Sequence, residues 1–100
     1  MKILLTGDRK WSDTGLINEI LDLYKPDQTI IAVKSDPIAP LIMKCANEKG
    51  FVVETCNEDY TGIDYVVVFH KYIRGSVQCK VLLKETSRLN IPYQIVGSSF

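Results

Sequence analysis

The sequence predicts an α/β protein built on a mainly parallel five-stranded sheet. Five short apolar segments have the length and composition of buried strands, and three longer segments between them repeat apolar residues at helical spacing. Strands that alternate with helices indicate a parallel sheet covered on both faces. A chain of 100 residues has the size of one domain, so we expect a single domain over residues 1–100.

The expected strands are residues 2–6, 28–33, 51–55, 65–69 and 92–96. The fourth of them, YVVVF, is the most continuously apolar, which is typical of a strand buried on both faces. Only the segment CNEDYTGID separates the third and fourth strands, and a parallel crossover normally takes more residues. Either a turn of helix is squeezed in, or the fourth strand runs antiparallel to the third. We predict that the fourth strand is central and parallel to the first.

Three helices are expected between these strands. Ser12 or Asp13 caps the first, which ends at Pro26. The second spans residues 37–49, where both of its prolines lie near the start and cost little. The third opens at Ser76. Its inward-facing residues are expected to be Cys79, Leu82, Leu83, Thr86 and Leu89.

Composition excludes several classes of partner. Twelve basic residues balance twelve acidic ones, so no bulk charge favours a nucleic-acid polymer or a membrane surface. No apolar run approaches the roughly 20 residues of a membrane span, and the start of the chain lacks a signal-peptide pattern. Cys45, Cys56 and Cys79 are odd in number and widely spaced, so we expect reduced thiols, a cytoplasmic location, and no zinc. No cofactor is expected.

Three loops should meet at the carboxyl edge of such a sheet, where open α/β sheets bind their ligands. They are residues 7–11, 34–36 and 70–76, and each carries at least one base and a small polar residue. The helices that follow aim N–H groups at the same place, which favours an anion. The candidate ligand-binding residues are Gly7, Asp8, Arg9, Trp11, Lys34, Ser35, His70, Arg74 and Ser76.

The opening TGDRKWSD resembles the T-G-S-R-x-W-x-D start of small proteins related to YspA, in the SLOG superfamily. This is the Rossmann-like group that includes DprA-like proteins and the Lonely Guy phosphoribohydrolases. Further along, VVVFH, Ser76 and LNIPYQIVG resemble the family's a-F-H, S-x-G-T and G-I-P-V segments in order. The resemblance implies a Rossmann-like three-layer sandwich with strand order 3-2-1-4-5. It also implies a pocket for a nucleotide-derived ligand, and it leaves a homodimer open, because small SLOG-like proteins often pair.

The sequence departs from this family at the places where chemistry would occur. The family's glycine-rich loop falls on residues 33–39, which read VKSDPIA and contain no glycine. The family's serine in T-G-S-R is Asp8 here, and the position of the Lonely Guy catalytic glutamate is Leu82. These departures favour binding without catalysis, so we assign no catalytic residue and no metal ligand.

The leading hypothesis is therefore non-catalytic binding of a nucleotide-derived or other small anionic ligand. Arg9, Lys34 and Arg74 would supply charge, Trp11 would stack, and Ser35 and Ser76 would donate hydrogen bonds. One alternative is a nucleoside-monophosphate phosphoribohydrolase, an N-glycosidase that would need the carboxylate of Asp8. A second alternative is a protein-interaction module with a decayed pocket. Two purely structural interpretations also stay open: Trp11 could cover the core, and His70 could serve the fold through hydrogen bonds.

Overall fold

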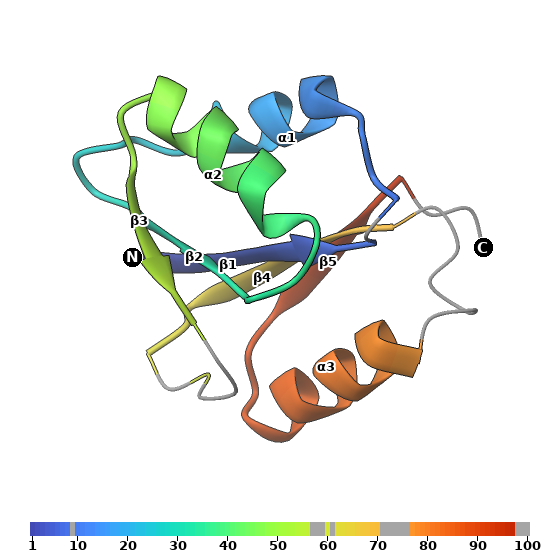
Figure 1. Ribbon diagram of the computed structural model, residues 1–100. Helices are drawn as coiled ribbons and strands as arrows, with labels where there is room; N and C mark the ends of the chain where they lie inside the picture. The colour runs from blue at the N-terminus through green and yellow to red at the C-terminus, as the bar shows by residue number, and fades with distance from the viewer. Residues whose placement is uncertain (9, 57–59, 61, 71–76, 98–100) are drawn as a thin grey trace.

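The computed structural model describes residues 1–8, 10–56, 60, 62–70 and 77–97. The strands are β1 (Lys2–Gly7), β2 (Ile30–Val33), β3 (Val52–Thr55), β4 (Tyr65–Phe69) and β5 (Tyr93–Val96). The helices are α1 (Thr14–Leu21), α2 (Ala39–Glu48) and α3 (Val77–Arg88). The fold is the predicted α/β sandwich of Rossmann-like type, with helices on both faces of the sheet (Figure 1).

The five strands form one sheet in the order β3-β2-β1-β4-β5, and all four neighbouring pairs are parallel. β4 lies beside β1, in a register that runs from Ile3 opposite Tyr65 to Gly7 opposite Phe69. The prediction that the fourth strand is central and parallel to the first is confirmed. β2 and β1 separate β3 from β4, so the alternative of an antiparallel β3–β4 pair is wrong.

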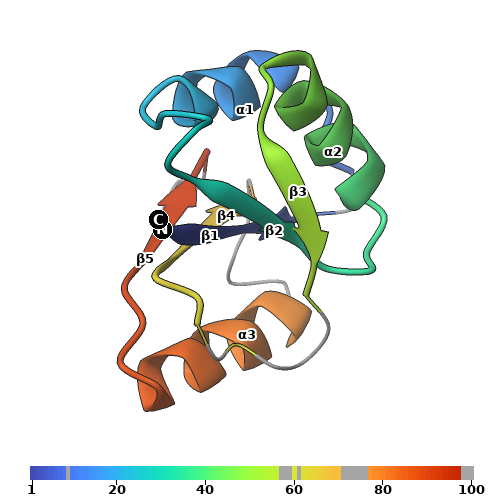
Figure 2. The ribbon, with the colours of Figure 1, turned by 90° about the vertical axis from the view of Figure 1, so that its left-hand side faces the viewer.

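Side chains that alternate along β1 divide the core into two clusters. Ile3 and Leu5 are buried under α1 and α2, which cover one face of the sheet together. Leu4 points to the opposite face, where α3 provides the only helical cover among the described residues (Figure 2). β1 is therefore buried on both faces, as its apolar run predicts.

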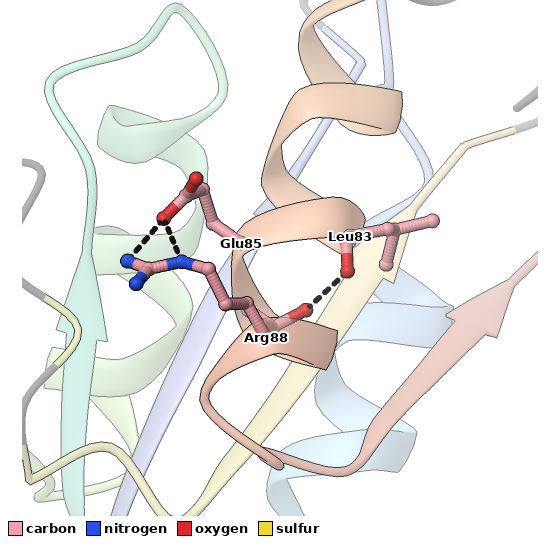
Figure 3. A network of polar contacts seen from close by, with 4 residues as sticks. Leu83, Glu85 and Arg88 are labelled. Atoms are coloured by element: carbon pink, nitrogen blue, oxygen red, sulfur yellow. Dashed lines mark hydrogen bonds and ion pairs between the residues drawn. The ribbon is translucent and has the colours of Figure 1, made fainter.

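The described side chains of α3 pack on the sheet through a narrow stripe; the inward placement expected for Cys79 lies outside the described side chains. Leu82 is 4% exposed and Thr86 is fully buried, and the Thr86 hydroxyl donates to the Leu83 carbonyl oxygen at 3.0 Å. On the helix surface Arg88 donates to Glu85 at 2.9 Å, an exposed i,i+3 pair (Figure 3). The inward placement expected for Leu89 is wrong: this residue is 42% exposed, because α3 ends at Arg88 and the chain then turns away.

α1 begins as predicted but ends earlier than predicted. Asp13 is the cap, since its carboxylate accepts the Leu16 amide at 3.2 Å. The helix stops at Leu21 instead of continuing to Pro26. The reason is local: the amide of Tyr24 bonds to the carbonyl of Leu21, three residues back, so the last turn tightens and the α-helical pattern is lost.

Candidate functional site

The carboxyl ends of β1 and β4 lie in direct backbone contact. Gly7 stands opposite Phe69, and a Cβ on Gly7 would lie 2.8 Å from the Phe69 nitrogen and closer still to its carbonyl oxygen. No side chain fits in that space, so the position requires glycine. The amide of Asp8 donates to the same carbonyl oxygen at 2.8 Å. The tight contact therefore fixes the point at which Asp8 leaves the sheet.

Asp8 and His70 meet at this edge, although they are far apart in the sequence. The Nε2 atom of His70 lies 4.0 Å from the Oδ2 atom of Asp8, too far for a direct hydrogen bond and within ion-pair range. The other carboxylate oxygen of Asp8 accepts the Lys10 amide at 3.1 Å. The Asp8 side chain is 29% exposed and that of His70 is 10% exposed. The carboxylate is thus the accessible member of the pair.

A second polar cluster links β1 to the segment after β2. The Thr6 hydroxyl donates to Asp36 Oδ2 at 2.6 Å, and the other oxygen of Asp36 accepts the Ala39 amide at 3.1 Å. Thr6 is 5% exposed, and Asp36 is half-buried. One carboxylate therefore accepts the first amide of α2 and ties that turn to the end of β1.

Lys34 belongs to the same edge and points to a partner that the sequence did not suggest. Its Nζ donates to the Tyr60 hydroxyl at 2.8 Å and lies 5.3 Å from the ring centroid. These two distances put the ammonium beside the hydroxyl and not over the ring face. Tyr60 is 7% exposed, so this bond anchors the segment after β3 to the end of β2.

Trp11 is buried, with 6% of its surface exposed. Its indole N–H donates to the Asp13 carbonyl at 3.0 Å, and its ring lies 5.6 Å from that of Phe69 at a tilt of 45°. Gly97 approaches the ring so closely that an added Cβ would lie 2.8 Å from Cζ3. The indole is therefore packed between the sheet and the chain after β5, where it serves the core and offers little surface to a ligand.

The remaining predicted residues divide into two groups. Ser35 is exposed at the edge, next to Lys34. Arg9, Arg74 and Ser76 lie outside the described residues, so their predicted roles stay predictions. Thr6, Asp36 and Tyr60 are polar groups of this edge that the sequence-based site did not include. Only Asp36 carried a signal, since it lies in one of the three loops expected at the carboxyl edge.

The described part of this edge can be compared with the catalytic and metal sites that the sequence left open. Within residues 1–8, 10–56, 60, 62–70 and 77–97, no three His, Cys, Asp or Glu side chains gather closely enough for a metal ion. Leu82, which the resemblance aligns with the Lonely Guy glutamate, lies on the buried face of α3. Cys45 and Cys56 are buried, and burial raises the pKa of Cys45.

Comparison with known proteins adds no relative. The chain matches no protein-family model, no curated protein and no solved structure. Its resemblance to the SLOG superfamily therefore stays a prediction from sequence motifs. In the part of the chain that the structure describes, no helix is both long enough and apolar enough to cross a membrane.

Proposed function

We propose that this protein binds a nucleotide-derived small molecule at the carboxyl edge of β1 and β4, and releases it chemically unchanged. The support comes first from topology. From β1, the chain first adds β2 and β3 on one side of that strand. It then adds β4 and β5 on the other side, so strand order reverses between β1 and β4. Open α/β sheets bind ligands at that switch point, beyond the carboxyl ends of the strands.

The observation that carries the proposal is the convergence of Asp8 and His70 at this point. Two side chains with hydrogen-bonding capacity lie 4.0 Å apart where the topology predicts a ligand. Both side chains follow the contact between β1 and β4, which is so close that no side chain fits at Gly7. A position held this rigidly suits the recognition of a small molecule.

Binding without catalysis is favoured by the surroundings of the pair. The glycosidase alternative has only Asp8 as its carboxylate, because the position that the resemblance assigns to the Lonely Guy glutamate is Leu82, 4% exposed in the core. A buried leucine neither donates nor accepts a proton. We therefore put the N-glycosidase second and the interaction module third.

A thermal-shift and calorimetry panel of nucleosides and their mono-, di- and triphosphates tests the proposal. A ligand present at 100 times its Kd stabilises the folded chain by about 2.7 kcal/mol, which is a rise in Tm of about 11–22 °C for a domain of this size. Arg9→Ala should weaken binding about 10- to 100-fold if its guanidinium grips a charged group. Arg88→Ala, at an exposed ion pair of α3, is the matched control and should bind like wild type.

Each alternative has its own outcome in the same experiment. Free base released during incubation with nucleoside monophosphates would favour the N-glycosidase. No stabilisation by any member of the panel would refute nucleotide binding and leave the interaction module. Equal affinities of wild type and Arg9→Ala for every ligand that binds would remove Arg9 from the site.

A further inference from the structure

Two helix-start amides that could attract a phosphate at this edge are engaged by the protein's own carboxylates. The Leu16 amide in the first turn of α1 donates to Asp13, and the Ala39 amide at the start of α2 donates to Asp36. Backbone amides at a helix start are the donors that anions normally use. At α1 and α2 an internal anion therefore stands where a bound phosphate would lie.

The Thr6 hydroxyl is engaged by Asp36 in the same way, whereas the Lys34 ammonium is held by a neutral group. The buried Thr6 hydroxyl donates to Asp36 at 2.6 Å, and the Lys34 ammonium donates to the Tyr60 hydroxyl at 2.8 Å. A phosphate placed between β1 and β2 would displace these bonds and approach the carboxylate of Asp36. The Asp36 carboxylate therefore disfavours an anion beside Thr6, while the Lys34 ammonium keeps its positive charge beside Tyr60.

Asp8 is the accessible acceptor that remains. Its carboxylate is 29% exposed, and only the Lys10 amide bonds to it within 3.5 Å among the described contacts. A carboxylate offers about four acceptor positions and no donor, so it pairs with a hydroxyl or amino group. Vicinal sugar hydroxyls are such donors.

We infer that Asp8 accepts the ribose hydroxyls of the ligand, and that the ligand's phosphate lies away from the β1–β2 edge. The ligand class is thus a ribonucleotide derivative with its 2′ and 3′ hydroxyls free. This inference rests on the proposed function. It adds the orientation of the ligand and a preference for ribose over deoxygenated sugars.

The test compares the four ribonucleoside 5′-monophosphates with their 2′,3′-dideoxy counterparts by calorimetry. Wild type should bind the ribose form about 10- to 100-fold more tightly, the range of a hydrogen bond to a charged group. Asp8→Asn should weaken ribose binding by a similar factor and reduce the ribose preference to less than threefold. Asp22→Asn removes the same charge from the exposed Asp22–Lys49 pair after the last turn of α1, and should bind like wild type.

The sign of the Asp8→Asn effect separates the two orientations. A phosphate beside Asp8 would be repelled by it, so the variant would then bind every nucleotide more tightly than wild type, and the inference would be overturned. Equal affinity of wild type for ribose and dideoxy forms would overturn it without any variant, and nucleotide binding would still stand. Failure of all eight nucleotides, and of the wider nucleotide panel, would overturn both.

Discussion

Replacing Gly7 by alanine should separate β1 from β4 at the candidate site. The added Cβ would lie 2.8 Å from the nitrogen and 2.9 Å from the carbonyl carbon of Phe69, all backbone atoms of a central strand. Such atoms ordinarily approach to about 3.5 Å, so the strands must part by about 0.7 Å or more. The hydrogen bond from the Asp8 amide to Phe69, 2.8 Å long in the native fold, would then pass its useful limit.

The cost can be estimated from these two effects. Overpacking against a rigid neighbour costs about 1–3 kcal/mol, and a buried hydrogen bond that is lost adds about 1 kcal/mol. We expect a fall of about 3 kcal/mol in the free energy of unfolding. In a domain of this size each kcal/mol shifts Tm by about 4–8 °C, so Tm should fall by about 12–24 °C.

Thermal and urea unfolding of Gly7→Ala beside Gly50→Ala makes the measurement specific. Gly50 has φ +83° and nothing within 4 Å of an added Cβ, so its variant reports backbone strain alone, about 1–2 kcal/mol. If Gly7→Ala is no less stable than Gly50→Ala, the close approach of β1 to β4 is not what the position requires. Weakened ligand binding by a folded Gly7→Ala would in turn tie this contact to the site.

Other predictions follow from the contacts around the edge and in the core. Asp36→Ala removes the side-chain acceptor of both the Ala39 amide and the Thr6 hydroxyl, so the free energy of unfolding should fall by about 2–3 kcal/mol. Thr6→Val removes only one of these bonds and should cost about 1 kcal/mol; equal losses in urea unfolding would contradict a contribution from the Ala39 contact. Leu82→Glu buries an unpaired carboxylate at a position that is 4% exposed, so it should prevent stable folding and create no glycosidase activity. The control Val81→Glu lies at a position that is 57% exposed and should melt like the parent. Burial raises the pKa of Cys45 above its ordinary value of 9.0, so the folded state holds this proton more tightly than the unfolded state. Stability is therefore fully kept below pH 9 and falls as the pH rises through the folded pKa; Cys45→Ala should lose less stability between pH 8 and pH 10, and an unchanged loss would exclude the thiol.

Much of the fold could be predicted because strand and helix periods are local properties of the sequence. YVVVF has no polar position, and this alone marks β4 as a strand buried on both faces. The ends of elements were less accurate, because they depend on single hydrogen bonds. α1 ends early, at Leu21, because the Tyr24 amide bonds to the carbonyl three residues back. Such a single hydrogen bond leaves no trace in the spacing of apolar residues in the sequence.

The candidate site was predictable only as an edge. Parallel topology brings the ends of β1 and β4 together, so Asp8 and His70 could be placed near each other from the sequence. Thr6 and Asp36 are hydrogen-bonded across 30 residues of sequence, and no local sequence pattern identifies either residue as the partner of the other. The burial of Trp11 likewise depends on Gly97, which packs on the indole from the other end of the fold.

β5 completes the edge of the sheet at which β1 ends. β5 is the final strand of the sheet, and the carbonyl of Val96 accepts the backbone amide of His70 at 3.0 Å. Gly97, one residue later, closes over Trp11. During synthesis the β1–β2–β3 half can emerge and pair, while the edge that holds His70 waits for residues 93–97 to leave the ribosome. The proposed binding site is then completed in a single late step, because a fragment without β5 lacks the backbone acceptor of the His70 amide.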